Sequence, residues 1–283
     1  MQNVQWRQRV IFVLIDGLSD SMAKRMLGYM EGLVEQRGAM RAKVRSILPS
    51  LSRPCYATIF TGQQPGHHGI TTNDQTQRIA EDSVFDLLAK NHRTSAVAGY
   101  HWMSELFSRG PFEFVRDREQ EGNPQGITSG RFYFEDGYPD SHVFADAERL
   151  RRVNDPDLLV IHPMGCDDAG HRHGAASREY AASAGQIDFL LAKLVPLWQS
   201  EGYHIVVTSD HGMDEYGFHG GTEESMRMSP LYVLNPQINP RGEVVEELLQ
   251  TQMAGFLCQL LDVSPSETMM PLDHLFQDLF FKS

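Results

Sequence analysis

Short apolar runs alternate with longer amphipathic segments along this chain, and the alternation predicts a β-sheet covered by helices. Residues 10–15 (VIFVLI) are apolar at every position and largely β-branched, which is typical of a strand buried on both faces. Further strands are predicted within 94–100, 156–165, 203–212 and 229–235. Helical patterns are predicted at 21–36, 54–60, 83–91, 177–198 and 243–261.

This order of elements predicts an α/β fold, in which a mostly parallel central sheet carries helices on both faces. A chain of 283 residues is long enough for one such domain, and we expect residues 1–283 to form it. The segment 101–150 departs from the pattern because it is rich in Gly, Pro, Arg and aromatic residues. We therefore expect this segment to be a small inserted cap.

The stretch 47–62 (ILPSLSRPCYATIFTG) has an unusual arrangement of prolines around serine. Proline favours extended backbone in the residue before it and is tolerated in the first turn of a helix. The chain is therefore expected to run extended to residue 51, turn at Ser52 and enter a helix at Pro54. Ser52 would then be the N-cap residue, and its hydroxyl has two possible roles, as a helix cap or as a nucleophile.

Acidic residues and histidines collect where three of the predicted strands end. In a parallel sheet, functional side chains gather beyond the carboxyl ends of the strands. Carboxylates and imidazoles that converge there suit Zn²⁺ or Mn²⁺, although a single Asp-Gly or Asp-His in isolation is more often part of an ordinary turn. The residues concerned are Asp16, then Asp167, Asp168, His171 and His173, then Asp210, His211, Asp214 and His219.

The composition limits which kinds of binding partner and which cellular compartment we expect for this protein. The net charge of −12 argues against a nucleic-acid polymer or an anionic membrane as partner, but not against a small anion held by metal ions. The three cysteines have no disulfide spacing, no secretory signal is visible, and no apolar run is long enough to span a membrane. We therefore expect a cytoplasmic protein, and the sequence leaves the oligomeric state open.

A set of motif residues gives the chain a family resemblance. The serine stretch continues into a Thr-Gly, a proline and a His-Gly, and the later clusters contain the motifs DDAGH and DHG. With these motifs the chain resembles the alkaline phosphatase superfamily, in its nucleotide pyrophosphatase/phosphodiesterase branch, over about 8–72 and 155–235. The residues of the first motif are Pro49, Ser50, Ser52, Pro54, Thr61, Gly62, Pro65, His68 and Gly69.

The resemblance implies an alkaline-phosphatase-like core, a nucleophile and two divalent metal ions, most commonly Zn, with Mn or Fe as alternatives. Ser52 takes the place of the nucleophile, so the expected reaction is hydrolysis of a small-molecule phosphate ester through a phosphoseryl intermediate. One metal ion would be held by Asp167, His171 and His219. The other would be held by Asp16, Asp210, His211 and the Ser52 oxygen.

Three further residues are candidate substrate contacts, namely Arg53, Cys55 and His173. The resemblance implies an Asn donor at position 55, and a thiol is a weaker hydrogen-bond donor. Arg53 could hold a phosphoryl oxygen or a substrate carboxylate, with a solvated surface arginine as the alternative. The related sulfatases carry an Arg at the place of Tyr56, so a sulfatase is disfavoured.

Several other functions are alternatives to a phosphodiesterase. A phosphomonoesterase or a phosphonoacetate-type hydrolase of the same superfamily would use the same metal site. A non-catalytic member that binds metal or phosphate is a second alternative, disfavoured by the complete ligand set. A membrane phosphoethanolamine transferase is set aside at this point because the sequence contains no membrane span.

Overall fold

The computed structural model of the chain describes residues 7–235, 242–274 and 276, and its centre is a single mixed β-sheet. Within these residues the strands follow the order β4-β5-β3-β6-β1-β7-β8-β2-β9. The strands are β1 (Val10–Ile15), β2 (Met40–Arg45), β3 (Ser95–Tyr100), β4 (Glu119–Gln120), β5 (Ser129–Tyr133), β6 (Leu158–Ile161), β7 (His204–Ser209), β8 (Met228–Leu234) and β9 (Gly242–Leu249).

The middle of the sheet is parallel, as the sequence predicts. β1 pairs in parallel with β6 on one side and with β7 on the other, and β3 pairs in parallel with β6 and β5. Every residue of β1 is buried, which explains its uninterrupted apolar sequence. β8 runs antiparallel to both β7 and β2.

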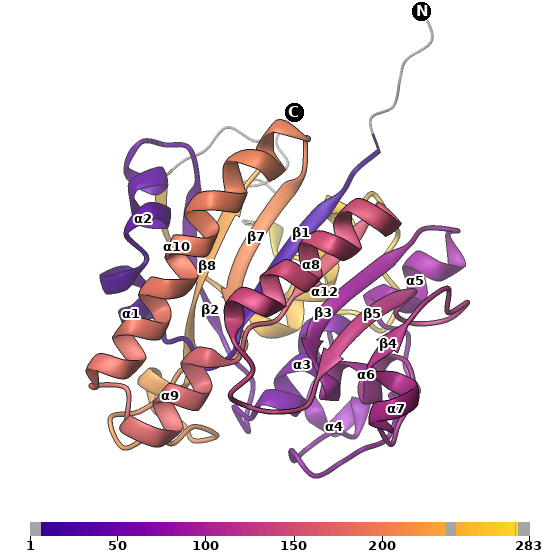
Figure 1. Cartoon of the computed structure of the whole chain (residues 1–283), viewed down its shortest axis with the longest axis horizontal. Coiled ribbons are helices and arrows are strands. Elements are labelled where there is room, and N and C mark those ends of the chain that lie inside the picture. The colour runs from indigo at the N-terminus through magenta and orange to yellow at the C-terminus, as the bar shows by residue number, and fades with distance from the viewer. Residues whose placement is uncertain (1–6, 236–241, 275, 277–283) are drawn as a thin grey trace, which may run out of the picture.

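Helices cover both faces of the sheet, and two apolar clusters form the core. Val10, Phe12 and Leu14 of β1 point into one cluster together with α3, α5, α6 and α12, while the alternate residues of β1 pack against α1, α2, α8 and α10. Figure 1 shows α8 and α10 crossing the near face of the sheet and α12 behind it. The helices are α1 (Asp20–Met26), α2 (Gly28–Glu35), α3 (Ser52–Thr61), α4 (Pro65–His68), α5 (Val84–Lys90), α6 (His101–Phe107), α7 (Phe114–Asp117), α8 (Asp140–Asn154), α9 (Gly165–His173), α10 (Arg178–Ser200), α11 (Glu224–Arg227), the 3₁₀ helix η1 (Gln250–Gln252) and α12 (Met253–Leu260).

Two predicted helices differ from the structure. The helix predicted at 21–36 consists of α1 and α2, which meet at Leu27. The helix predicted at 243–261 is wrong over its first part, which forms the edge strand β9, and correct over α12. The Glu- and Leu-rich sequence of β9 favours a helix locally, but pairing with β2 overrides that preference.

The prediction of a cap at 101–150 also needs correction. β5 pairs with β3 in the central sheet, and α8 packs on the core through Val143, Phe144 and Leu150. The segment therefore extends the core and is not a separate cap. Its strand was missed because β5 (SGRFY) contains Gly130 and a partly exposed Arg131, which interrupt the apolar pattern of a buried strand.

Candidate metal centre

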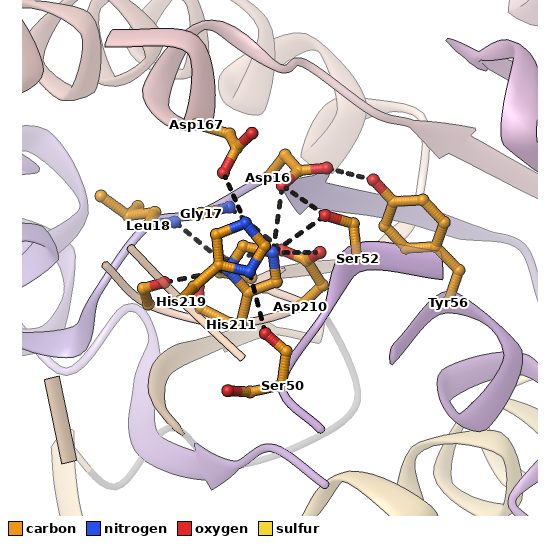
Figure 2. A network of polar contacts seen from close by, with 12 residues as sticks. Asp16, Gly17, Leu18, Ser50, Ser52, Tyr56, Asp167, Asp210, His211 and His219 are labelled. Atoms are coloured by element: carbon orange, nitrogen blue, oxygen red, sulfur yellow. Dashed lines mark hydrogen bonds and ion pairs between the residues drawn. The ribbon is translucent and has the colours of Figure 1, made fainter. Parts of the chain in front are cut away.

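Three neighbouring strands bring the predicted site residues together at one edge of the sheet. Asp16 directly follows β1, Asp210 and His211 directly follow β7, and the turn after β6 leads into α9, which carries Asp167 and His171. Because β6, β1 and β7 are adjacent and parallel, these carboxyl ends lie side by side. Figure 2 shows Asp16, Asp167, Asp210 and His211 converging with Ser52 from α3 and with His219, which lies between β7 and α11.

The first group of ligands surrounds the serine hydroxyl. Asp16, Asp210 and His211 offer ligand atoms that lie within 4.8 Å of one another, and all three residues are buried. His211 Nε2 is 3.2 Å from Asp210 Oδ2 and 3.4 Å from Asp16 Oδ1. Ser52 Oγ lies 3.0 Å from His211 Nε2 and 3.5 Å from Asp16 Oδ1, so the hydroxyl is part of this group.

The second group lies directly beside the first. Asp167, His171 and His219 also offer ligand atoms within 4.8 Å of one another. His171 Nε2 is 3.3 Å from Asp167 Oδ2, and the Nε2 atoms of His171 and His219 are 3.2 Å apart. The rings of His219 and His211 are stacked with their centroids 3.8 Å apart, so the two groups are in contact.

Backbone carbonyls fix the orientation of all three histidines. The Nδ1 atoms of His171, His211 and His219 lie 2.8, 2.9 and 3.0 Å from the carbonyl oxygens of Gly217, Gly212 and Ser50. A carbonyl oxygen can only accept, so each Nδ1 carries the hydrogen and donates it. The Nε2 lone pairs are thereby left to face the carboxylates, as in histidines that bind metal ions.

The charges in the site fit divalent cations. Burial and the neighbouring charge of Asp16 raise the pKa of Asp167, and raise the pKa of Asp210 well above its ordinary value. Asp167 Oδ1 and Asp210 Oδ2 are buried and have no hydrogen-bond partner among the described residues. Three buried carboxylates around imidazole nitrogens are costly without a counter-charge, and the donor set suits Zn²⁺ or Mn²⁺.

Ser52 sits differently from the predicted helix cap. α3 begins at Ser52, its N-cap residue is Leu51, and the Ser52 hydroxyl faces the metal ligands. The backbone N–H of Arg53 donates to Asn73 Oδ1 at 3.0 Å, and Pro54 has no N–H. The helix-cap role of Ser52 is therefore wrong, and its role as nucleophile stays a prediction. Asn73, which the sequence did not point to, also contacts this helix start.

The three predicted substrate contacts do not meet at the site. The Arg53 side chain is buried and forms an ion pair with Glu105, so it is neither a surface group nor a free anion binder. Cys55 is buried, and burial raises the pKa of its thiol well above the ordinary value. His173 is exposed at the end of α9. Arg53 and Cys55 are expected at the site because they closely follow Ser52, and His173 because it closely follows His171, but the structure buries the first two side chains and leaves the third exposed.

Tyr56 and His162 are further residues that the sequence did not assign to the site. The Tyr56 hydroxyl donates to Asp16 Oδ2, and His162 Nε2 lies 3.3 Å from the same oxygen. Although burial raises the pKa of Asp16, these contacts and the nearby His211 hold it at about 2. Both side chains therefore keep Asp16 ionised and oriented.

The comparisons with known sequences identify a family. The model of the type I phosphodiesterase / nucleotide pyrophosphatase family matches residues 10–228. Human GPI ethanolamine phosphate transferase 2, catalytic subunit, is 26% identical over 263 residues, which are 88% of this chain and 26% of that protein. Human GPI ethanolamine phosphate transferase 3, catalytic subunit, is 35% identical over 195 residues, which are 66% of this chain and 16% of that protein.

Solved structures support the same fold. Murine ectonucleotide pyrophosphatase / phosphodiesterase 5 superimposes with a TM-score of 0.74 at 14% identity, covering 96% of this chain and 100% of that chain. The human protein of the same name also gives a TM-score of 0.74 at 14% identity. The predicted α/β core of the alkaline phosphatase type is thus confirmed.

The sequence relatives bear on an alternative that the sequence analysis set aside. Their names place them among the ethanolamine phosphate transferases, and the chain spans about a quarter of the length of the first of them. Among the described residues, no helix has both the length and the apolar character needed to cross a membrane. Neither finding tests the cytoplasmic location, which stays a prediction.

Proposed function

Because the chain belongs to the type I phosphodiesterase / nucleotide pyrophosphatase family, we propose that it is a two-metal phosphodiesterase that works through a phosphoseryl intermediate. The observation that carries the proposal is the position of Ser52 Oγ, 3.0 Å from His211 Nε2 and beside two contiguous groups of metal ligands. The Ser52 hydroxyl contacts His211 and Asp16 of the first group, and Ser52 is also the residue at the nucleophile position of the family motif.

The residues that would hold the cations are those of the two groups described above. Asp16, Asp210, His211 and the Ser52 oxygen would hold one ion, and Asp167, His171 and His219 the other. Bound cations lower the pKa of a hydroxyl and neutralise charge on phosphoryl oxygens, which is the chemistry that this donor set would supply. Zn is the first choice, with Mn or Fe as alternatives.

The chain's own residues then perform a double displacement. Ser52 loses its proton to solvent, its Oγ forms a bond to phosphorus, and the bond from phosphorus to the leaving oxygen breaks. The departing alkoxide takes up a proton from solvent. Asn73, whose Oδ1 accepts from the amide next to Ser52, would donate from Nδ2 to a phosphoryl oxygen. Water then attacks the phosphoserine, the Oγ–phosphorus bond breaks, and a phosphomonoester leaves.

A second candidate function differs only in the last step. The sequence relatives are named ethanolamine phosphate transferases, which supports a reaction in which an alcohol replaces water as the acceptor. Ser52, the metal ligands and the phosphoseryl intermediate would serve both reactions. The phosphomonoesterase and phosphonoacetate-type hydrolase readings also use this site and differ in substrate. Small phosphate esters remain the proposed substrate class in each case.

The first experiment compares zinc- and manganese-loaded protein on bis-p-nitrophenyl phosphate and p-nitrophenyl phosphate. We expect faster cleavage of the diester, and a loss of at least about a thousandfold in Ser52→Ala with its metal content retained. Ser200→Ala, an exposed serine on α10, is the control and keeps the wild-type rate. Residual Ser52→Ala activity within tenfold of wild type would refute the nucleophile, and faster monoester cleavage would favour a phosphomonoesterase.

The same assay separates water from an alcohol as acceptor. Wild-type protein is incubated with the diester and ethanolamine, and the products are separated. The hydrolase predicts p-nitrophenyl phosphate as the main product. A mixed diester of ethanolamine and p-nitrophenol as the main product would instead assign a transferase.

A further inference from the structure

The residue that follows the proposed nucleophile is the most completely buried arginine near the site. Arg53 is only 1% exposed to solvent, and its Nη1 lies 2.8 Å from Glu105 Oε2. Its guanidinium also stacks over the Trp102 ring, with Cζ 4.5 Å from the ring centroid. Glu105 is itself held in place, because its Oε1 accepts from the backbone N–H of Phe112 at 2.9 Å.

Arg53 holds one surface loop at two points. Its backbone N–H donates to Asn73 Oδ1 at 3.0 Å, and its Nη1 donates to the carbonyl oxygen of Gln75 at 2.5 Å. The loop forms a unit of its own, because the Gln75 side chain accepts from the N–H of Thr72 at 3.0 Å and donates to the carbonyl of Gly69 at 2.7 Å. Arg53 thus joins the segment 69–75 to the first turn of α3.

We propose that Arg53 is a positioning residue, which clamps the segment 69–75 onto the nucleophile end of α3 and keeps Asn73 beside Ser52. The ion pair with Glu105 and the stack on Trp102 hold the guanidinium, and the guanidinium holds the loop. As far as turnover is concerned, the inference rests on the proposed function. The clamp itself is a statement about structure and can be tested without turnover.

The chemistry of the contacts explains why arginine stands here. A planar guanidinium can stack on an aromatic ring and donate to two different oxygens at once, whereas an ammonium group is a compact point charge that does not stack in this way. Arg53 donates through Nη1 to the Gln75 carbonyl and is ion-paired with Glu105, while its Cζ lies over the Trp102 ring. Lysine keeps the charge for Glu105, but it is expected to lose the stack and the contact with the Gln75 carbonyl.

The test compares Arg53→Lys with a matched control, Arg41→Lys. Arg41 is also 1% exposed and ion-paired, with Asp20 and Glu31, but it contacts neither Ser52 nor the segment 69–75. We expect Arg53→Lys to lower kcat on bis-p-nitrophenyl phosphate about 10–100-fold, with KM within about threefold and metal content unchanged. We expect faster amide hydrogen exchange in the 69–76 peptide of Arg53→Lys. Arg41→Lys should show neither effect.

Two further variants test how Arg53 acts. If Arg53 acts by holding Asn73, then Arg53→Lys should lower kcat much less in an Asn73→Ala background than in wild type. Trp102→Phe, which keeps an aromatic ring for the guanidinium, should retain most of the activity and most of the exchange protection. It therefore serves as a milder variant if Arg53→Lys folds poorly.

The outcomes are distinguishable. Unchanged exchange of the 69–76 peptide in Arg53→Lys would overturn the clamp, even if the wild-type protein turned over no substrate at all. A raised KM with unchanged kcat would overturn it in favour of a direct substrate contact. Wild-type protein without Ser52-dependent turnover would refute the proposed function, while faster exchange in Arg53→Lys would still support the clamp.

Discussion

Four side chains of the site contact the Asp16 carboxylate, namely Ser52, Tyr56, His162 and His211. Asp16 Oδ1 lies 3.5 Å from Ser52 Oγ, while Asp16 Oδ2 accepts from the Tyr56 hydroxyl and lies 3.3 Å from His162 Nε2. One oxygen is thus free to face a metal ion and the other is held by neighbouring side chains. Such outer contacts orient a metal ligand and tune its affinity.

Tyr56→Phe tests whether the two oxygens of the Asp16 carboxylate have these different roles. The variant removes the donor to Asp16 Oδ2 and leaves the ring in the core, so we expect the affinity for the metal ion next to Ser52 to fall about 10–100-fold. The measurement is a competition between protein and a chelator of known affinity. Tyr232→Phe is the control, because its hydroxyl also donates to a carboxylate, that of Glu31, away from the site. Equal affinities in all three proteins would contradict the prediction.

At the scale of elements, the turn 214–218 holds one of the histidines, His171, in place. Asp214 Oδ1 accepts from the N–H groups of Tyr216 and Phe218 at 2.9 and 2.8 Å, and the Gly217 carbonyl accepts from His171 Nδ1. Gly217 has φ +86°, and a Cβ there would lie 2.6 Å from the Gly170 carbonyl oxygen. The turn therefore requires glycine and brings α9 close to the segment that carries His219.

Asp214→Ala should loosen this turn. The loss of two hydrogen bonds to a buried carboxylate is expected to lower the free energy of unfolding by about 1–3 kcal/mol and to weaken binding of the second metal ion. Urea unfolding and a metal titration measure the two effects. Asp168→Ala removes an ion pair with the exposed Arg172 and should cost less than about 1 kcal/mol. A larger effect in Asp168→Ala than in Asp214→Ala would show that the turn has no such role.

At the scale of the whole molecule, an ionic cluster around Asp157 stabilises the sheet just before β6. Asp157 Oδ1 accepts from Arg7 at 2.6 Å and from Arg93 at 2.9 Å, and Asp157 Oδ2 accepts from the backbone N–H of Thr94 at 2.8 Å. Although burial raises the pKa of Asp157, these donors lower it to about 2. The cluster fixes the segment that leads into β3 against the segment that leads into β6.

This lowered pKa predicts a pH-dependent stability. A carboxyl whose folded pKa is lowered contributes stability that is fully present above its unfolded pKa, near 4, and lost as the pH falls through about 2. Asp157→Asn should therefore be less stable than wild type by about 1–2 kcal/mol at pH 7, a range that takes account of solvent screening of the contact with Arg7. This difference in the free energy of unfolding should shrink between about pH 4 and pH 2. Asp155→Asn, an exposed neighbour, is the control for urea unfolding across this range. A difference that is constant with pH would contradict the assigned pKa.

Metal removal is the test that involves the whole fold. The ligands come from β1, β6–α9, β7 and α3, so bound cations would tie together segments far apart in sequence and relieve repulsion among buried carboxylates. Metal at a hundred times its dissociation constant should stabilise the protein by about 2.7 kcal/mol, or about 5–10 °C in Tm. Thermal unfolding with zinc and after chelation measures this shift. An unchanged Tm would argue against a metal site of that affinity.

Local sequence was enough for the centre of the fold. The uninterrupted apolar runs of β1, β6 and β7 predict buried parallel strands, and the polar residues directly after them predict a site at one edge. β2 and β5 were missed, and β9 was predicted as a helix. Their sequences contain Arg, Lys, Gly or Glu, and only pairing with a neighbouring strand makes them strands.

Some residues of the site could likewise be predicted from the sequence, and others could not. Asp16, Asp210 and the other proposed metal ligands could be named from the sequence, because acids and histidines collect after three predicted strands and match the motifs of a family. Asn73, Tyr56 and the buried state of Arg53 were decided only by the tertiary structure. In the sequence alone, a tyrosine that orients a metal ligand cannot be distinguished from a tyrosine of the core. An arginine that holds a loop likewise cannot be distinguished from an arginine on the surface. Long-range packing alone determines which partner each side chain meets.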